Sequence, residues 1–307
     1  MDLPQIYKAM ADHTRLRIMS VLGRGWFNVG ELTEALAATQ SNISHHLKTL
    51  SSAELITQKK QGTWSYYTIA LESEHPLAHS IASNFMQFSE QFPLSVPNEF
   101  IEDRNRLRAV QSKRRDTTRA FFESVASDWP QLRLKAIGSE DFVPIVQKHV
   151  EPTLSFVELG CGAGVILKEL LPRDGTTIGV DNSPAMLEVA KEELLSKGVD
   201  LRLGDLEHLP LSDESADVAL AHMVLHHVVT PVEALRDARR ILKPGGKLVV
   251  IDLCTHTDEV MREQFADVWL GFEKQEFVGW CKEAGFCKVE SESLGQNDQA
   301  FLVTAYK

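Results

Sequence analysis

Three acidic residues in the second half of the chain stand at the ends of short apolar stretches. Glu158 precedes the glycine-rich run 160–164, Asp181 follows 23 residues later, and Asp205 follows after another 24 residues. If these stretches are neighbouring parallel strands, their carboxyl ends meet along one edge of the sheet. There Asp181 can accept hydrogen bonds from both hydroxyls of a ribose, and Asp205 is placed to face an adenine amino group. The spacing therefore predicts a pocket for an adenosine-type ligand.

The position of Glu158 discriminates between ligands that contain adenosine. Dinucleotide-binding enzymes hold a pyrophosphate at the N-terminus of the helix that follows the glycine turn. A carboxylate directly before that turn disfavours a dianion and favours a cationic group. S-adenosylmethionine carries both an ammonium and a sulfonium group, so the electrostatics favour it over NAD.

The elements that position these acids alternate between strands and helices. We expect strands at 155–159, 177–180, 200–203, 217–223 and 247–252, and helices from the glycine turn to 171, at 184–196 and at 231–242. This alternation predicts a doubly wound, Rossmann-like parallel sheet within an α/β protein. Its ligand site lies at the carboxyl ends of the strands.

A different kind of surface is predicted near the N-terminus, on a helix over 39–50. Ile43, Leu47 and Leu50 fall on one stripe at about 100° per residue and should be buried. A face with short polar side chains and one lysine suits the major groove of DNA. We expect DNA contacts from Gln40, Ser41, Ser44, His45 and Lys48.

The segments around this helix complete a winged helix-turn-helix. Helices are expected at 15–22 and 29–36, and a hairpin over 55–69 that turns at Gln61 and Gly62. Lys59 and Lys60 lie near the tip of the hairpin, where a wing contacts phosphates.

The middle of the chain is expected to join two domains. A helical apolar stripe is formed by Leu77, Ile81, Phe85, Phe88 and Phe92. A hinge follows at 93–98, and residues 99–120 form a heavily charged stretch that we expect to be a solvated connecting helix. The predicted limits are 1–92 for the DNA-binding and dimerisation domain, 93–118 for the linker and 119–307 for the pocket domain.

The composition agrees with this division. The 307 residues carry a net charge of −11, but residues 1–70 have seven basic and five acidic side chains, a net charge of +2. A mildly basic N-terminal region on an otherwise acidic chain is consistent with DNA binding confined to one end. The four cysteines form no CxxC pair, and no apolar run is long enough to span a bilayer. We therefore expect a cytoplasmic protein that makes no contact with a membrane.

The N-terminal blocks resemble the ArsR type of winged-helix repressor. The blocks are residues 11–18, 29–32, 41–50 and 62–67. The resemblance implies a homodimer that binds an inverted-repeat operator in double-stranded DNA. Many members of this group sense metals, but segment 27–32 lacks the cysteine pair of the thiolate-dependent members, and His46 lies at the edge of the buried stripe. No metal site is therefore expected.

The C-terminal blocks resemble class I S-adenosylmethionine-dependent methyltransferases. The blocks are residues 157–164, 179–187, 204–210 and 240–248. The resemblance implies that Glu158, Gly160 and Gly162 line the methionine end of the ligand and that Asp181 holds the ribose. It places Asn182, Met186, Asp205 and Leu206 around the adenine, and His222 beside the cofactor. Head and tail together look like the fused ArsR and methyltransferase-like regulators of bacteria.

A cofactor pocket does not by itself establish turnover, because methyl transfer can proceed by proximity and orientation alone. His222, His226 and His227 follow the fourth strand, where a general base or a packing residue would stand. The interpretation we favour is a transcriptional regulator with S-adenosylmethionine or S-adenosylhomocysteine as effector, acting on genes of the methionine and S-adenosylmethionine cycle. The alternative is an active methyltransferase, with an unidentified substrate, that carries a DNA-binding head.

Overall fold

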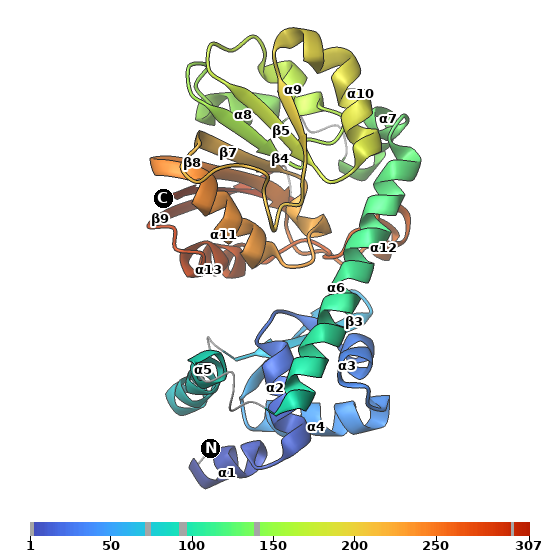
Figure 1. The fold of residues 1–307 in the computed structure, drawn as a ribbon, viewed down its shortest axis with the longest axis vertical. Coiled ribbons are helices and arrows are strands. Elements are labelled where there is room, and N and C mark those ends of the chain that lie inside the picture. The colour runs from blue at the N-terminus through green and yellow to red at the C-terminus, as the bar shows by residue number, and fades with distance from the viewer. Residues whose placement is uncertain (1–2, 71–74, 92–96, 138–141, 296–297) are drawn as a thin grey trace. The chain divides into compact units, whose positions relative to one another are not determined.

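A computed structural model describes residues 3–70, 75–91, 97–137, 142–295 and 298–307. The chain forms two compact units, Met1–Arg114 and Arg115–Lys307, and the boundary between them falls within helix α6 (Asn98–Val125) (Figure 1). Most of the expected hinge at 93–98 lies outside the described residues, as does Phe92 of the apolar stripe.

The N-terminal unit is a winged helix-turn-helix. It contains α1 (Leu3–Met10), α2 (His13–Leu22), α3 (Val29–Leu36), α4 (Gln40–Ser52) and α5 (Pro76–Gln91), together with strands β1 (Phe27–Asn28), β2 (Ile56–Gln61) and β3 (Trp64–Ile69). The three strands form an antiparallel sheet in the order β1-β3-β2, and β2 and β3 are the expected hairpin.

Side-chain caps fix where the helices of this unit begin. Asp12 accepts a hydrogen bond from the N–H of Arg15 at 3.0 Å, and Asn28 and Glu31 form a reciprocal capping box at the start of α3. Thr39 caps α4 by accepting from the N–H of Asn42 at 3.4 Å. The predicted stripe of Ile43, Leu47 and Leu50 is buried in the core of the unit, as expected.

The first part of α6 belongs to the N-terminal unit, which differs from the solvated linker expected at 93–118. One face of the helix buries Phe100, Leu107 and Val110. Asp103, only 1% exposed, accepts from Nε and Nη2 of Arg17 at 2.7 Å each and from Nη2 of Arg106 at 2.6 Å. The burial of Asp103 has no local signal in the sequence because its partner Arg17 lies 86 residues away along the chain.

The C-terminal unit is built on a seven-stranded sheet in the order β6-β5-β4-β7-β8-β10-β9. The strands are β4 (Phe156–Leu159), β5 (Thr177–Asp181), β6 (Asp200–Leu203), β7 (Ala216–His222), β8 (Leu242–Leu253), β9 (Lys288–Leu294) and β10 (Ala300–Tyr306). The first five are parallel to one another, and β10 pairs antiparallel with β8 and β9. The predicted doubly wound α/β architecture is thus confirmed for a mostly parallel sheet.

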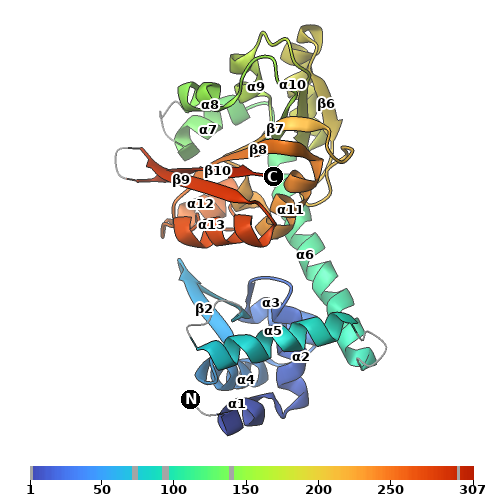
Figure 2. The same cartoon turned by 90° about the vertical axis from the view of Figure 1, so that its left-hand side faces the viewer.

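Helices cover both faces of this sheet (Figures 1 and 2). The group α8 (Val143–His149), α9 (Val165–Leu170) and α10 (Pro184–Leu194) lies on one face, and α11 (Pro231–Ile241) and α13 (Lys274–Glu283) lie on the other. The unit also contains α7 (Trp129–Ile137), α12 (Glu259–Phe265) and short 3-10 helices η2 (Leu195–Lys197) and η3 (Leu225–His227). Among the described residues, none of the helices combines the length and apolar character needed to cross a bilayer.

The strand order reverses next to β4, and this reversal positions the site. From β4 the chain moves outward through β5 and β6, then returns to place β7 on the other side of β4. In open parallel sheets a ligand binds in the crevice at such a switch point, beyond the carboxyl ends of the strands.

We predict that Asp103→Ala lowers the free energy of unfolding of the N-terminal unit by about 3 kcal/mol, because it leaves the charge of Arg17 without its buried partner. Urea unfolding followed by circular dichroism measures the change. Glu102→Ala is the matched control. That side chain is 65% exposed, and its Oε2 lies 3.6 Å from Nη1 of Arg106, which is longer than a hydrogen bond. Equal effects of the two substitutions would contradict the proposed role of Asp103.

Candidate functional site

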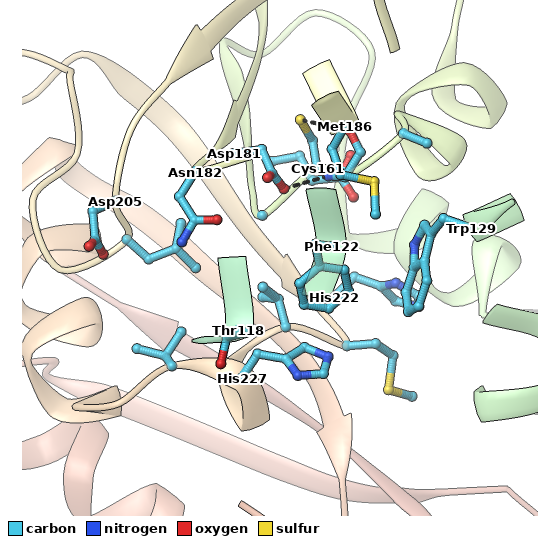
Figure 3. A pocket seen from close by; sticks show the side chains of 18 of the residues that line it. Thr118, Phe122, Trp129, Cys161, Asp181, Asn182, Met186, Asp205, His222 and His227 are labelled. Atoms are coloured by element: carbon cyan, nitrogen blue, oxygen red, sulfur yellow. Dashed lines mark hydrogen bonds between the residues drawn. The ribbon is translucent and has the colours of Figure 1, made fainter. Parts of the chain in front are cut away.

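A pocket lies at the switch point of the C-terminal sheet, with about 1020 Å³ of free space including its open mouth. Side chains of Thr118, Phe122 and Trp129, from α6 and α7, lie against it (Figure 3). Figure 3 shows Asp205 and Asn182 toward one end of the pocket and Trp129 toward the other. The structure brings all nine residues predicted for the ligand to its lining: Glu158, Gly160, Gly162, Asp181, Asn182, Met186, Asp205, Leu206 and His222.

Asp181 links the end of β5 to the glycine turn. Its Oδ2 accepts from the N–H of Gly162 at 2.8 Å and its Oδ1 from the N–H of Ser183 at 2.9 Å. A carboxylate offers about four lone-pair positions, so each oxygen keeps one for a ligand hydroxyl. Burial raises the pKa of Asp181, and the backbone N–H groups of Ser183 and Gly162 act against that increase.

The glycines of the turn serve two different purposes. Gly160 has φ +70°, and a Cβ there would lie 2.2 Å from Val224, so this glycine allows the turn to pack against the loop after β7. Gly162 has φ +51°, and a Cβ there would meet nothing closer than the indole nitrogen of Trp129, at 3.7 Å. Only the second therefore leaves room beside the backbone within the pocket.

Glu158 is a buried acid with one unsatisfied oxygen. The residue is 2% exposed, and Oε2 has no hydrogen-bond partner among the described residues. Burial raises the pKa of Glu158 to about 8, and the nearby charge of Asp181 acts in the same direction. A cationic ligand group in the pocket would restore the ionised form, because it supplies the missing counter-charge.

Two arginines that the sequence analysis did not assign to the pocket also line it. Arg115 donates to Oε2 of Glu207 at 2.8 Å, and its Nε lies 3.9 Å from Oδ2 of Asp205. Arg133, on α7, lowers the pKa of both Glu158 and His222 by its charge. Arg115 lies in the charged stretch 99–120, and its pairing with an acid 92 residues away leaves no local signal.

The histidines after β7 differ in their environments. Burial lowers the pKa of His222 to about 4, and burial together with the charge of His226 holds the pKa of His227 well below its usual value. Burial also opposes charge on His226, but Asp252 and Asp267 raise its pKa to about 9. His222 and His227 line the pocket. Neither of these two described pocket histidines is therefore a base that titrates near neutral pH.

The predicted DNA-contacting residues of α4 share one solvent-exposed face. Gln40, Ser41, Ser44, His45 and Lys48 are all exposed, whereas His46 is half-buried with Nδ1 3.7 Å from Oδ1 of Asp12. In the hairpin, Lys60 is exposed, and the ammonium of Lys59 lies 4.1 Å from the centre of the Trp26 ring. Lys60 is thus the better placed of the two lysines for a phosphate.

The cysteines do not form a common site in the described structure. All four are free thiols, with Cys161 and Cys281 buried, Cys254 half-buried and Cys287 exposed. Burial holds the pKa of Cys161 well above its usual value, and the charges of Asp181 and Glu158 act in the same direction. Its thiol is therefore poorly suited to act as a nucleophile.

Two family profiles match the chain. Residues 12–58 match the bacterial regulatory protein, arsR family, and residues 157–250 match a methyltransferase domain. The first profile spans α2 to β2, and an arsR-family helix-turn-helix implies DNA binding. The second spans β4 to β8, including all the strand ends that line the pocket. A methyltransferase domain implies S-adenosylmethionine binding.

Individual proteins resemble the chain only over part of its length. An uncharacterised 37.1 kDa protein of transposon TN4556 from Streptomyces fradiae is 43% identical over 103 residues, which are 32% of this chain and 30% of that protein. An arsenite methyltransferase from Halobacterium salinarum is 34% identical over 109 residues, 33% of this chain and 28% of that enzyme. The chain thus spans about a third of the length of these relatives.

Among solved structures, a SAM-dependent methyltransferase from Thermotoga maritima superposes with a TM-score of 0.50 and 25% identity. The match covers 61% of this chain and 99% of that one. The fold of the C-terminal unit is therefore that of a SAM-dependent methyltransferase.

We predict that Glu158→Gln stabilises the ligand-free protein in a pH-dependent manner. A carboxyl group whose pKa is raised on folding contributes fully below its usual pKa of 4.5, and that contribution is lost as the pH rises through about 8. Removing the ionisation should therefore leave stability unchanged at pH 4.5 and increase it by about 2–4 kcal/mol at pH 8.

Urea unfolding across this pH range measures the effect. The control is Glu193→Gln, an exposed carboxylate that pairs with Lys168 on the same unit. A stability gain that does not grow with pH would show that Glu158 is not the buried acid responsible.

Proposed function

Because the chain carries an arsR-family helix-turn-helix and a methyltransferase domain, we propose that it is a transcriptional regulator with S-adenosylmethionine or S-adenosylhomocysteine as its effector. The genes it controls would belong to the methionine and S-adenosylmethionine cycle. A ligand that fits the DNA-competent and DNA-incompetent forms differently shifts their ratio, with a typical coupling of ~1–3 kcal/mol.

The pocket chemistry carries this proposal. The buried carboxyl of Glu158, with its unpartnered Oε2, suits the ammonium of the ligand, and the remaining lone pairs of Asp181 suit the two ribose hydroxyls. Arg133, which also lines the pocket, would then receive the carboxylate of the methionine part. Asn182, Met186, Asp205 and Leu206 would surround the adenine, as the family resemblance implies.

The low basicity of the two pocket histidines argues only against methyl transfer that uses one of them as a general base. A methyl acceptor that must lose a proton needs a base, and burial leaves His222 with a pKa of about 4. Phe122 and Trp129 pack edge-to-face with ring centres 5.1 Å apart where an acceptor would approach. The alternative function, methyl transfer to an unidentified acceptor, is supported by the match to a methyltransferase domain and by the partial likeness to an arsenite methyltransferase and to a solved SAM-dependent methyltransferase.

DNA binding would involve the exposed face of α4 and the hairpin. Gln40, Ser41, Ser44, His45 and Lys48 would contact bases and backbone in the major groove, and Lys59 and Lys60 would contact phosphates. Such a regulator binds an inverted repeat as a homodimer. For the dimer interface we propose an apolar groove between α1 and α5, where Tyr7 is 57% and Phe88 is 66% exposed.

The experiment that tests this function is fluorescence anisotropy of the full chain on its own upstream DNA, without ligand and with each of the two candidate effectors. A change in dissociation constant of tenfold or more with one ligand would support the proposal and identify the effector. Tight DNA binding that neither ligand alters would overturn it and leave methyl transfer as the function to assay.

We predict that Asp181→Ala weakens the binding of the effector at least tenfold, because it removes the acceptor for the ribose and the partner of the Gly162 N–H. DNA affinity without ligand should change little. Isothermal titration calorimetry and the anisotropy assay measure the two quantities. Asp200→Ala, an exposed acid of the same sheet, is the control, and unchanged ligand affinity in Asp181→Ala would refute the pocket assignment.

We predict that Lys60→Ala lowers affinity for all DNA sequences alike and reduces the slope of log K against log salt by about 1, because one phosphate contact is lost. Lys197→Ala removes the same charge from an exposed position on the other unit and should change neither quantity. An unaltered salt slope in Lys60→Ala would mean that the hairpin does not contact the phosphates.

A further inference from the structure

A group of potential metal ligands lies beside the ligand pocket, although the sequence analysis expected no metal. His226 and His227 belong to η3, and Asp267 follows α12 some 40 residues later. Their ligand atoms all lie within 4.8 Å of one another, and all three residues are buried or half-buried. The separation in sequence explains why spacing alone did not reveal the group.

The distances within this group suit a bridging ion better than direct hydrogen bonds. Oδ1 of Asp267 lies 3.8 Å from Nε2 of His226 and 3.6 Å from Nδ1 of His227. A hydrogen bond between such atoms is shorter, about 2.7–3.2 Å. Ligands about 2.0–2.2 Å from a tetrahedral ion lie about 3.3–3.6 Å apart, so ligand atoms that are here within 4.8 Å of one another would move closer together to complete the coordination.

Asp267 lacks the partners that a buried carboxylate needs. Its residue is 3% exposed, and neither of its oxygens has a hydrogen-bond partner in the part of the chain that the structure describes. Arg262 lies near enough to influence it, but Nη1 of that guanidinium donates to Glu259 at 2.8 Å. A buried carboxylate without hydrogen bonds is costly unless an ion or a metal compensates it.

The other side of His226 is held as in known metal sites. Its Nδ1 lies 2.6 Å from Oδ1 of Asp252, a fully buried residue whose Oδ2 accepts from the N–H of Leu225 at 2.9 Å. Since an ionised carboxylate only accepts, Nδ1 carries the proton, and a metal ion would bind Nε2, the nitrogen on the side of Asp267, by displacing any proton held there. Metal-binding histidines commonly donate their second N–H to a carboxylate in this manner.

We propose that His226, His227 and Asp267 bind a divalent transition-metal ion of the zinc type. Two imidazole nitrogens and one carboxylate oxygen are a ligand set that suits Zn²⁺ or Co²⁺ better than Mg²⁺ or Ca²⁺, which prefer oxygen ligands throughout. A water molecule would complete the tetrahedron. The ion would tie η3 to the segment after α12.

Bound metal would also act on the ligand pocket. His227 lines the pocket and packs edge-to-face on Phe122, with ring centres 4.9 Å apart. In the structure Nδ1 of His227 lies 3.3 Å from the carbonyl oxygen of Ala266, which only accepts, so coordination through Nδ1 would replace that hydrogen bond and leave the ring proton on Nε2. The bound ion would then fix the orientation of this imidazole and with it one wall of the pocket. The ion would bind in the same way whether the pocket serves a sensor or an enzyme.

The test uses the full chain, stripped of metal with a chelator and then titrated with Zn²⁺ and with Co²⁺. We expect one equivalent to bind, with the visible absorption bands of tetrahedral Co²⁺ and an increased unfolding temperature. In Asp267→Asn, which keeps the shape but not the charge, Zn²⁺ affinity should fall at least tenfold. His208→Gln, which alters an exposed histidine outside the group, should bind as the wild type does.

Absence of stoichiometric binding would overturn the proposal. A protonated His226, which lies between Asp252 and Asp267, would then compensate the charge of Asp267 in place of a metal ion. Equal Zn²⁺ affinity in the wild type and in Asp267→Asn would also overturn it, because the ion would then bind elsewhere. Should Asp267→Asn fail to fold, X-ray absorption of the Co²⁺-loaded wild type decides. Two imidazoles in the coordination shell are expected, and a shell with fewer would refute the site.

Discussion

The hydrogen bond between the glycine turn and the end of β5 is the constraint on which the ligand pocket depends. The N–H of Gly162 points at Asp181 because the backbone there adopts a positive φ, which holds the turn after β4 against the neighbouring strand. The order of the sheet then places the ends of β6 and β7 on either side of this pair. Residues at the ends of four strands thus face one pocket.

The electrostatics of the pocket follow from this arrangement. Glu158 and Asp181 are brought close together in a site where burial disfavours their charges, and the pKa of each is raised. The arginines at the margins compensate only in part, since Arg115 is bound to Glu207. A ligand with a cationic group and a vicinal diol would supply the counter-charge for Glu158 and the hydrogen-bond donors for Asp181. The same acids would repel a pyrophosphate, as the sequence alone already indicates.

The features that the sequence predicted are those with a local signal. The stripe of Ile43, Leu47 and Leu50 follows helical spacing, and the strand-end acids are marked by the glycine turn and by regular intervals. The features that the sequence did not predict depend on residues that are far apart along the chain. Asp103 holds Arg17 across 86 residues and makes part of the expected linker a buried face, and Asp267 meets His226 and His227 only in the folded unit. The antiparallel edge formed by β9 and β10 was also not expected.

The unsatisfied oxygen of Glu158 has a consequence for how long the protein persists in a cell. A domain that holds an uncompensated buried acid opens more often when its pocket is empty than when a bound cation satisfies that acid. Proteases act on the opened chain, so its half-life would lengthen as the ligand accumulates. The cellular concentration of the protein, as well as the fraction that is ligand-bound, would then rise with the concentration of the ligand.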